Sequence, residues 1–178
     1  MDKAVGAVPR TVCIGGMRKD EILSALKQKG IQLNEIAQTL LAHRAFEVAD
    51  ARSTIEIAEV SVRDLGLTRG ATLEQVFERA AEHGLALCPL ELAAHLRLQF
   101  TDQPEGFVGY PPSTGRAPPG ALTIAVRPIA SGDGVPMGFY LRRICGVLWL
   151  RGYRSPAEHV WDADDRFVFR RKGKDPVL

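Results

Sequence analysis

Residues 139–152 read Phe-Tyr-Leu-Arg-Arg-Ile-Cys-Gly-Val-Leu-Trp-Leu-Arg-Gly and carry the clearest β-strand pattern in the chain. Side chains of alternating character flank Cys145-Gly146, and glycine suits the positive φ that a two-residue hairpin turn requires. This turn predicts the cross-strand pairs Ile144 with Val147, Arg142 with Trp149, and Tyr140 with Arg151. One face of the hairpin is then expected to enter the core through Phe139, Leu141, Leu148 and Leu150.

The opposite face of the same hairpin carries a candidate binding surface, made of Tyr140, Arg142, Trp149 and Arg151. Arginines opposite aromatic rings suit cation–π stacking, and the same mixture is typical of surfaces that hold a partner. Two interpretations therefore remain open. The side chains form a ladder that stabilises its own sheet, or they hold a protein or a small anionic ligand.

Outward from the hairpin, the pattern predicts further strands at 11–14, 54–62, 122–126 and 166–171. Helices are predicted at 20–29, after an N-cap at Asn34, and after Thr72, where Gln75 completes a capping box. Ser155-Pro156-Ala157-Glu158 predicts one more short helix. The fold class that follows is α+β. We expect a helix-rich N-terminal half packed on a mostly antiparallel sheet of about four to six strands from the C-terminal half.

The expected domain organisation is a single domain over residues 11–171, with a helical part at 18–46 and an α+β part at 54–171. Residues 1–10 and 172–178 are expected to be flexible ends. The stretch 101–120, rich in proline and glycine, is longer than an ordinary connection and predicts a functional or disordered loop.

The composition indicates an ordinary globular chain. It has 178 residues, of which 46% are hydrophobic and 25% charged, and a formal net charge of +2. That charge is too small to argue for nucleic acid or a membrane surface. Three widely spaced cysteines form no disulfide framework, and neither a signal segment nor a membrane span is visible. We therefore expect a cytoplasmic protein with no membrane partner.

A candidate catalytic cluster lies at Cys88, Glu91 and His95, which are three and four residues apart. Pro89 suits the first position of a helix, so Cys88 would be its N-cap and the three side chains would share one face. A helix N-terminus lowers a thiol pKa, which favours a nucleophile. The alternative is structural: Glu91 caps the helix, Cys88 packs as a small apolar group, and His95 lies at the core edge. From Leu96 onward the alternation predicts a strand.

Two further motifs give weaker predictions. Residues 20–43 resemble a helix-turn-helix in outline, and Gln32, Asn34 and Gln38 could read bases. The second helix is not basic, however, so an αα-hairpin packed on the sheet is the favoured interpretation. Asp162, Asp164 and Asp165 lack the spacing of a calcium loop and predict a turn. No metal site is predicted, and the sequence leaves any cofactor unknown.

Several stretches together resemble a group of small, uncharacterised bacterial proteins. They are Leu87–Leu92, His95–Gln99, Phe139–Arg143, Leu148–Tyr153 and Asp165–Phe169, so the resemblance extends over most of residues 60–171. It implies no activity, cofactor or partner, and therefore no residue roles.

The leading hypothesis is thus a non-enzymatic binding module that uses the Tyr140, Arg142, Trp149 and Arg151 face. A small-molecule enzyme or metal site at Cys88, Glu91 and His95 is the first alternative. DNA binding through residues 20–43 is the second. Whether the protein is an enzyme, and in which oligomeric state it exists, are left open.

Overall fold

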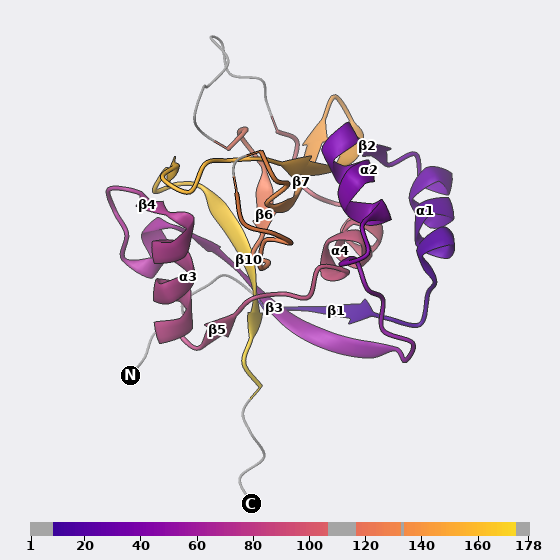
Figure 1. The fold of residues 1–178 in the computed structure, drawn as a ribbon, viewed down its shortest axis with the longest axis horizontal. Coiled ribbons are helices and arrows are strands. Elements are labelled where there is room, and N and C mark those ends of the chain that lie inside the picture. Colours follow the sequence, from indigo (N-terminus) through magenta and orange to yellow (C-terminus); the bar gives the residue numbers. More distant parts are fainter. Residues whose placement is uncertain (1–8, 107–116, 133, 174–178) are drawn as a thin grey trace, which may run out of the picture.

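The computed structural model describes residues 9–106, 117–132 and 134–173 (Figure 1). The helices are α1 (Lys19–Gln28), α2 (Glu35–Ala42), α3 (Leu73–Glu82) and α4 (Leu92–Gln99), with a 3-10 turn η1 (Arg63–Leu65). The strands are β1 (Arg10–Ile14), β2 (Gln32–Leu33), β3 (Ser53–Ser61), β4 (Ala71–Thr72), β5 (Leu85–Ala86), β6 (Leu122–Ile124), β7 (Gly138–Ile144), β8 (Val147–Tyr153), β9 (Val160–Trp161) and β10 (Arg166–Arg171).

One large mixed sheet organises the molecule. Its strand order is β1-β3-β10-β6-β7-β8-β2, and β5 adds to β10 as the eighth strand. The β6–β10 and β2–β8 pairs are parallel, whereas the other pairs in this sheet are antiparallel. Strands β4 and β9 form a separate two-stranded ribbon.

The predicted fold class was therefore wrong in its details, although the α+β mixture is present. The sheet is larger than four to six strands, it is mixed, and β1, β2 and β3 come from the N-terminal half. The four helices of the described residues alternate with strands β1 to β5 along residues 10–99, so the N-terminal half is not a helical layer. Strands at 11–14 and 54–62 were predicted but were not assigned to this sheet, and two-residue strands such as β2 and β5 are too short to show a period.

The hairpin prediction is confirmed. β7 and β8 pair as expected, with Tyr140 opposite Arg151, Arg142 opposite Trp149 and Ile144 opposite Val147. Cys145 and Gly146 form the turn at φ values of 51° and 75°. A cysteine at positive φ is strained, and the following glycine accepts the same conformation without a steric penalty.

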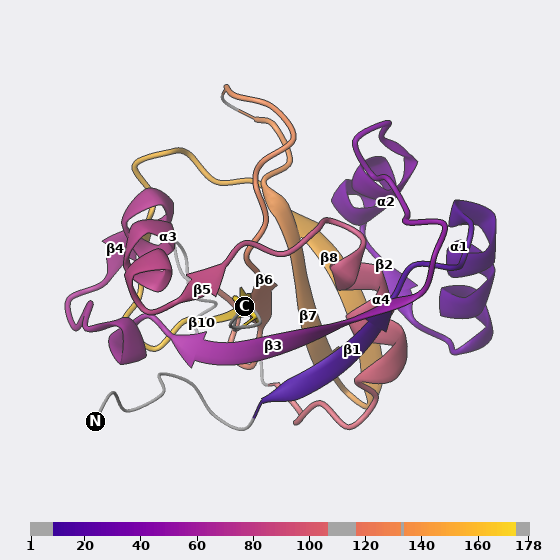
Figure 2. The same ribbon diagram turned by 90° about the horizontal axis from the view of Figure 1, so that it is seen from below.

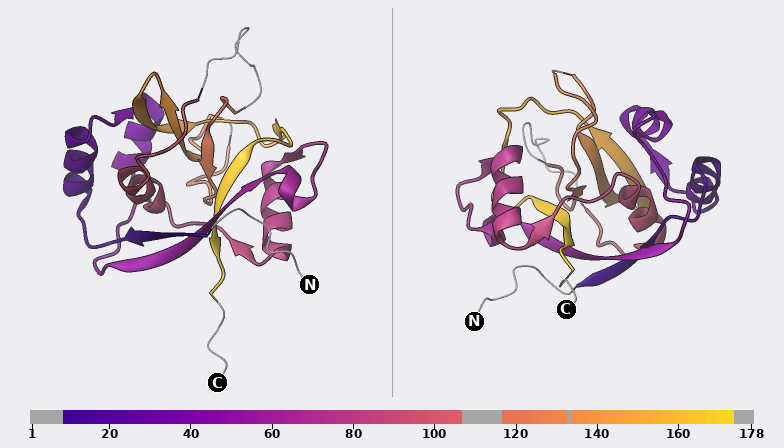
Figure 3. Two further views of the ribbon diagram at one scale, coloured as in Figure 1. Left: turned by 180° about the vertical axis from the view of Figure 1, so that it is seen from behind. Right: turned by 60° about the horizontal axis from the view of Figure 1, so that its bottom comes forward.

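The sheet separates two hydrophobic clusters, and alternate residues of one strand enter each of them. On β10, Val168 joins the cluster under α1, α2 and α4, whereas Phe167 and Phe169 join the cluster under α3. Helices therefore cover both faces of the sheet rather than one. In Figures 1 and 3, α3 lies at one end of the molecule and α1 and α2 lie at the other.

Helix α4 is enclosed by the sheet. It packs against β1, β7 and β8, and Figure 2 shows it inside the curve that these strands form with β3. Residues 92–97 are all buried, which explains why this helix lacks the one-sided apolar stripe of a surface helix. The predicted change to a strand after Leu96 was wrong, because apolar residues on every side of a buried helix imitate alternation.

The segment that resembles a helix-turn-helix has a different structure. Residues 32 and 33 between its helices form β2, which extends the sheet beside β8. The Asn34 side chain caps α2 by accepting from the Ala37 N–H, and it also exchanges two hydrogen bonds with the Gly152 backbone. A Cβ at Gly152 would lie 2.6 Å from the Ile36 side chain, so glycine allows α2 to pack directly on β8. The segment thus packs on the central sheet and is not a free helix-turn-helix.

Two other local predictions need correction, and three concern residues that cannot be compared. Residues 155–158 form a turn before β9 rather than a helix, because Val160 and Trp161 already pair with β4. Arg10 belongs to β1 rather than to a flexible end. The predictions for the remaining N-terminal residues, for most of the tail and for the middle of the 101–120 loop concern residues 1–8, 174–178 and 107–116, which lie outside the described residues.

Candidate functional site

The three residues of the predicted catalytic cluster separate into two environments. Cys88 is buried, and its thiol donates to the Val168 carbonyl at 3.5 Å. Burial raises the pKa of this thiol to about 12, so the group is protonated at neutral pH. Helix α4 begins only at Leu92, and Cys88 therefore does not occupy the helix N-cap that was predicted to lower its pKa.

Glu91 and His95 do come together. Their side chains are both buried, and Glu91 Oε2 lies 3.3 Å from His95 Nε2. The carboxylate accepts from the Ala49 N–H at 3.3 and 3.4 Å instead of capping α4, so the capping interpretation was wrong. The Gly15 N–H also points at His95 Nε2, at 3.2 Å. Burial lowers the pKa of His95, although the Glu91 carboxylate opposes this effect.

The predicted binding face lies on the side of the sheet that α3 covers only in part. Tyr140, Arg142, Trp149 and Arg151 are all half-buried. The Arg151 guanidinium lies 5.1 Å from the centre of the Trp149 ring, a cation–π contact along one strand rather than between the strands. The predicted face thus exists, and part of its polar surface is engaged in stabilising its own sheet.

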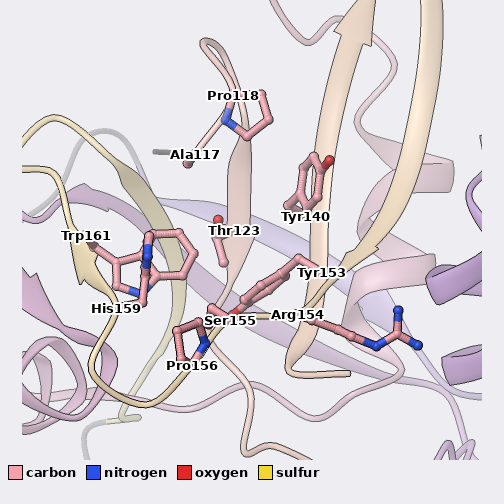
Figure 4. Close-up of a pocket in the computed structure, with 10 residues that line it drawn as sticks. All are labelled: Ala117, Pro118, Thr123, Tyr140, Tyr153, Arg154, Ser155, Pro156, His159 and Trp161. Carbon is pink, nitrogen blue, oxygen red and sulfur yellow. The ribbon is translucent and has the colours of Figure 1, made fainter. Parts of the chain in front are cut away.

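Tyr140 also belongs to a pocket beside this face, with a cavity volume of about 280 Å³. In Figure 4, Tyr140 and Tyr153 stand on one side, Trp161 and His159 on the other, and Thr123 between them. We call this the aromatic pocket; its wall is Ala117, Pro118, Thr123, Tyr140, Tyr153, Arg154, Ser155, Pro156, His159 and Trp161.

The register of the sheet explains how these residues meet. Thr123 on β6 pairs with Tyr140 on β7, and Gly138 on β7 pairs with Tyr153 on β8. Thr123, Tyr140 and Tyr153 consequently point to the same side of the sheet. Trp161 closes the opposite wall from β9, where its ring packs edge-on against Tyr153 at 5.6 Å and against Phe167 at 4.9 Å.

The Trp161 side chain leaves a hydrogen-bond donor without a partner. Trp161 is 4% exposed, and its Nε1 atom has no hydrogen-bond acceptor among the described residues. A buried N–H without an acceptor costs about 1–3 kcal/mol, so such groups are rare and call for an explanation. Trp161 lines the aromatic pocket, so an acceptor that reaches this buried N–H from the pocket would supply the missing bond.

The charges around the pocket are positive. Its wall includes Arg154 and, among the described residues, no aspartate or glutamate. The Arg154 side chain extends away from the centre in Figure 4, and its Nε donates to the Gly134 carbonyl at 2.6 Å. Burial raises the pKa of Tyr140, while the nearby Arg151 and Arg142 act in the opposite direction. Two guanidinium groups are therefore close enough to stabilise negative charge at the Tyr140 end.

Sequence reasoning identified Tyr140 but missed Thr123, Tyr153, His159 and Trp161. Tyr153 and Thr123 could have been found by extending the hairpin alternation to the neighbouring strand. Trp161 could not, because its place depends on the pairing of β9 with β4, two strands of only two residues each. No local pattern predicts such a pair.

Other kinds of site find no support. Within residues 9–106, 117–132 and 134–173, no three histidine, cysteine, aspartate or glutamate side chains are grouped in a way that could bind a metal ion. In that same part of the chain, no helix combines the length and apolar character that crossing a bilayer requires. Comparisons with protein-family models, with curated proteins and with solved structures give no match, so the proposals that follow are based on the geometry of this chain.

Proposed function

We propose that this protein is a binding module for a small planar ligand that carries negative charge, held in the aromatic pocket. The observation that carries the proposal is the buried Trp161 N–H, which lacks an acceptor among the described residues. A ring of the ligand would pack between Tyr140 on one side of the pocket and Trp161 and His159 on the other. An oxygen of its acidic group would accept from Trp161, while Arg142 and Arg151 beside Tyr140 make the opposite side of the pocket favourable to negative charge.

The shape and chemistry of the wall favour an aromatic carboxylate over other small molecules. A cavity of about 280 Å³ is small and suits one or two rings. Aromatic walls could also hold an organic cation, but such sites gain from nearby negative charge. This wall carries hydroxyl and N–H donors and a guanidinium, with no acidic side chain among its described residues, which favours an anion.

Binding is favoured over catalysis at the sequence-predicted cluster. A thiol nucleophile needs a lowered pKa and access to substrate. Cys88 is buried with a raised pKa, and its thiol is directed to the Val168 carbonyl rather than to His95. The aromatic pocket, in contrast, is open to a ligand and contains the unpartnered donor.

Benzoate is a suitable probe, and isothermal titration calorimetry is the measurement. We expect benzoate to bind with a dissociation constant below about 1 mM, and benzamide, its neutral analogue, to bind at least tenfold more weakly, about 1.4 kcal/mol. Trp161→Phe keeps an aromatic ring and removes the N–H. It should weaken benzoate binding by about tenfold, because hydrogen bonds to charged groups contribute about 1.5–3 kcal/mol.

Trp149→Phe is the matched control, since Trp149 lies on the neighbouring surface and outside the pocket wall. This variant should bind benzoate with unchanged affinity. Its single remaining tryptophan is Trp161, so its fluorescence should change when benzoate binds. Equal affinities for the wild type and a folded Trp161→Phe variant, or no binding of benzoate at 5 mM (roughly fivefold above that limit), would overturn the proposal.

A further inference from the structure

A second cavity lies at the other end of the molecule and shares no residue with the aromatic pocket. It is a groove of about 530 Å³ between α1, α4 and the paired strands β1 and β3. Met17, Ala25 and Leu98 give it apolar walls, and Lys29 and Arg52 line it with positive charge. His95, from the Glu91–His95 pair, also lines it.

His95 lines this groove and keeps one ring nitrogen without a hydrogen-bond partner among the described residues. The residue is 3% exposed, and the recorded interactions of its ring, with the Gly15 N–H and with Glu91 Oε2, are both at Nε2. Nδ1 has no hydrogen-bond partner among the described residues. Because the residue lines the groove, this nitrogen is the polar atom of the ring that remains for a ligand.

The two partners of Nε2 require different protonation states. A neutral ring with an unprotonated Nε2 accepts from Gly15, and its proton is then on Nδ1. A charged ring donates from Nε2 to Glu91 and still has a proton on Nδ1. In both of these states Nδ1 carries a proton and is a donor. A neutral ring protonated at Nε2 also donates to Glu91 and leaves Nδ1 as an acceptor. An anion in the groove, next to Lys29 and Arg52, selects the states in which Nδ1 is protonated.

We infer that this groove is a second ligand site, which takes a short aliphatic carboxylate. One carboxylate oxygen accepts from His95 Nδ1–H, Lys29 and Arg52 supply the opposite charge, and the aliphatic chain lies against Met17, Ala25 and Leu98. The described lining contains no acidic residue, so charge selects an anion. The larger, less aromatic wall separates this ligand from the planar one of the aromatic pocket.

Proton uptake should accompany binding. The charged groups around His95 are Glu91, which directly precedes its helix, and Lys29 after α1 and Arg52 before β3, which line the same groove. The turn after β1 contributes the Gly15 N–H. A carboxylate at Nδ1 and Glu91 at Nε2 together stabilise an imidazolium between two acceptors. The proton comes from the buffer, so titrations in phosphate and in Tris should differ in apparent enthalpy.

Hexanoate is the probe, and the affinity is measured by calorimetry. Lys29→Gln should weaken hexanoate binding about threefold to tenfold at low salt, because it removes a charge at the groove. Lys27→Gln removes the same charge from the same helical end, outside the groove lining, and should leave the affinity unchanged. Hexanol, with the same chain and no charge, should bind at least tenfold more weakly.

Nitrogen NMR of the imidazole rings provides a readout that does not depend on a variant. Hexanoate should shift the His95 Nδ1 resonance, and Trp161→Phe should not alter this shift. The inference is overturned if hexanoate leaves the His95 resonances unchanged, or if Lys29→Gln and Lys27→Gln bind it equally well. Benzoate binding to the aromatic pocket is scored separately, so either site can fail alone.

Discussion

The two faces of the central sheet are built from alternate residues of the same strands, yet polar side chains are buried to different extents on them. On the face under α1, α2 and α4, the polar side chains Glu91, His95 and Arg97 are buried within a helix that the sheet encloses. On the face under α3, apolar packing ends at Trp161 and Tyr153, and the aromatic pocket begins there. Both faces keep a cavity, but the groove on the enclosed face is lined by helices α1 and α4, whereas the aromatic pocket is lined by strands and loops.

Arg97 shows how the enclosed face holds a buried charge without a carboxylate, although its Nε has no acceptor among the described residues. Its guanidinium donates to Gln103 Oε1 at 2.6 Å and to the backbone carbonyls of Phe100 and Trp149. Burial lowers its pKa to about 10, and the nearby Arg143 contributes to this shift. Gln103 in turn donates to the carbonyls of Gly120 and Leu141. The network connects α4 to the strands that carry the aromatic pocket.

The largest expected effect comes from breaking this network. Arg97→Met should lower the free energy of unfolding by about 3 kcal/mol, because it leaves buried acceptors without donors. Urea denaturation followed by circular dichroism measures this loss. Arg143→Met removes a half-exposed guanidinium paired with Glu105 and should cost less than about 1 kcal/mol. A loss of under 1 kcal/mol for Arg97→Met would show that the buried guanidinium of the enclosed face contributes no more to stability than the half-exposed Arg143.

The helix caps give a smaller and matched comparison. Asn34 caps α2 on the enclosed face and also bonds to Gly152, whereas Thr72 caps α3 on the open face through a capping box with Gln75. Asn34→Ala should therefore cost about 2 kcal/mol and Thr72→Ala about 1 kcal/mol. Thermal and urea unfolding of both variants measure the difference. Equal losses would mean that the bonds to Gly152 add nothing.

The smallest effect is a pH dependence that belongs to the enclosed face. His95 has a pKa below its ordinary value of 6.5 in the folded protein, so the unfolded chain binds a proton there that the native state does not. Stability from this group is complete above pH 6.5 and is lost as the pH falls. One proton gives at most about 1.4 kcal/mol per pH unit.

The free energy of unfolding measured between pH 8 and 5 tests this dependence. His95→Gln should flatten the decline below pH 6.5, and the same change at the exposed His83, His83→Gln, should leave it in place. Parallel profiles for the wild type and His95→Gln would contradict the assignment of this pH dependence to His95.

Most elements with strong local signals were predicted correctly, although the helix-start motif at 155–158 forms a turn. The hairpin of β7 and β8 was predicted residue by residue, because its turn and alternation are contained within fourteen residues. The capping box of α3 and the cap at Asn34 were also predicted from short motifs. The candidate site was predicted only in part: Tyr140 belongs to the aromatic pocket, but the grouping of Cys88 with Glu91 and His95 was wrong.

The sequence by itself therefore determined the hairpin, its two faces, the helix caps and the absence of a strong charge. These features depend on neighbours within one or two turns of chain, where residue type and spacing decide the conformation. Only the tertiary structure decided the strand order, the burial of α4, and the meeting of Trp161 with Tyr153 or of His95 with Gly15. These arrangements join residues far apart in the chain through short strands and a curved sheet, and such contacts leave no periodic trace in the sequence.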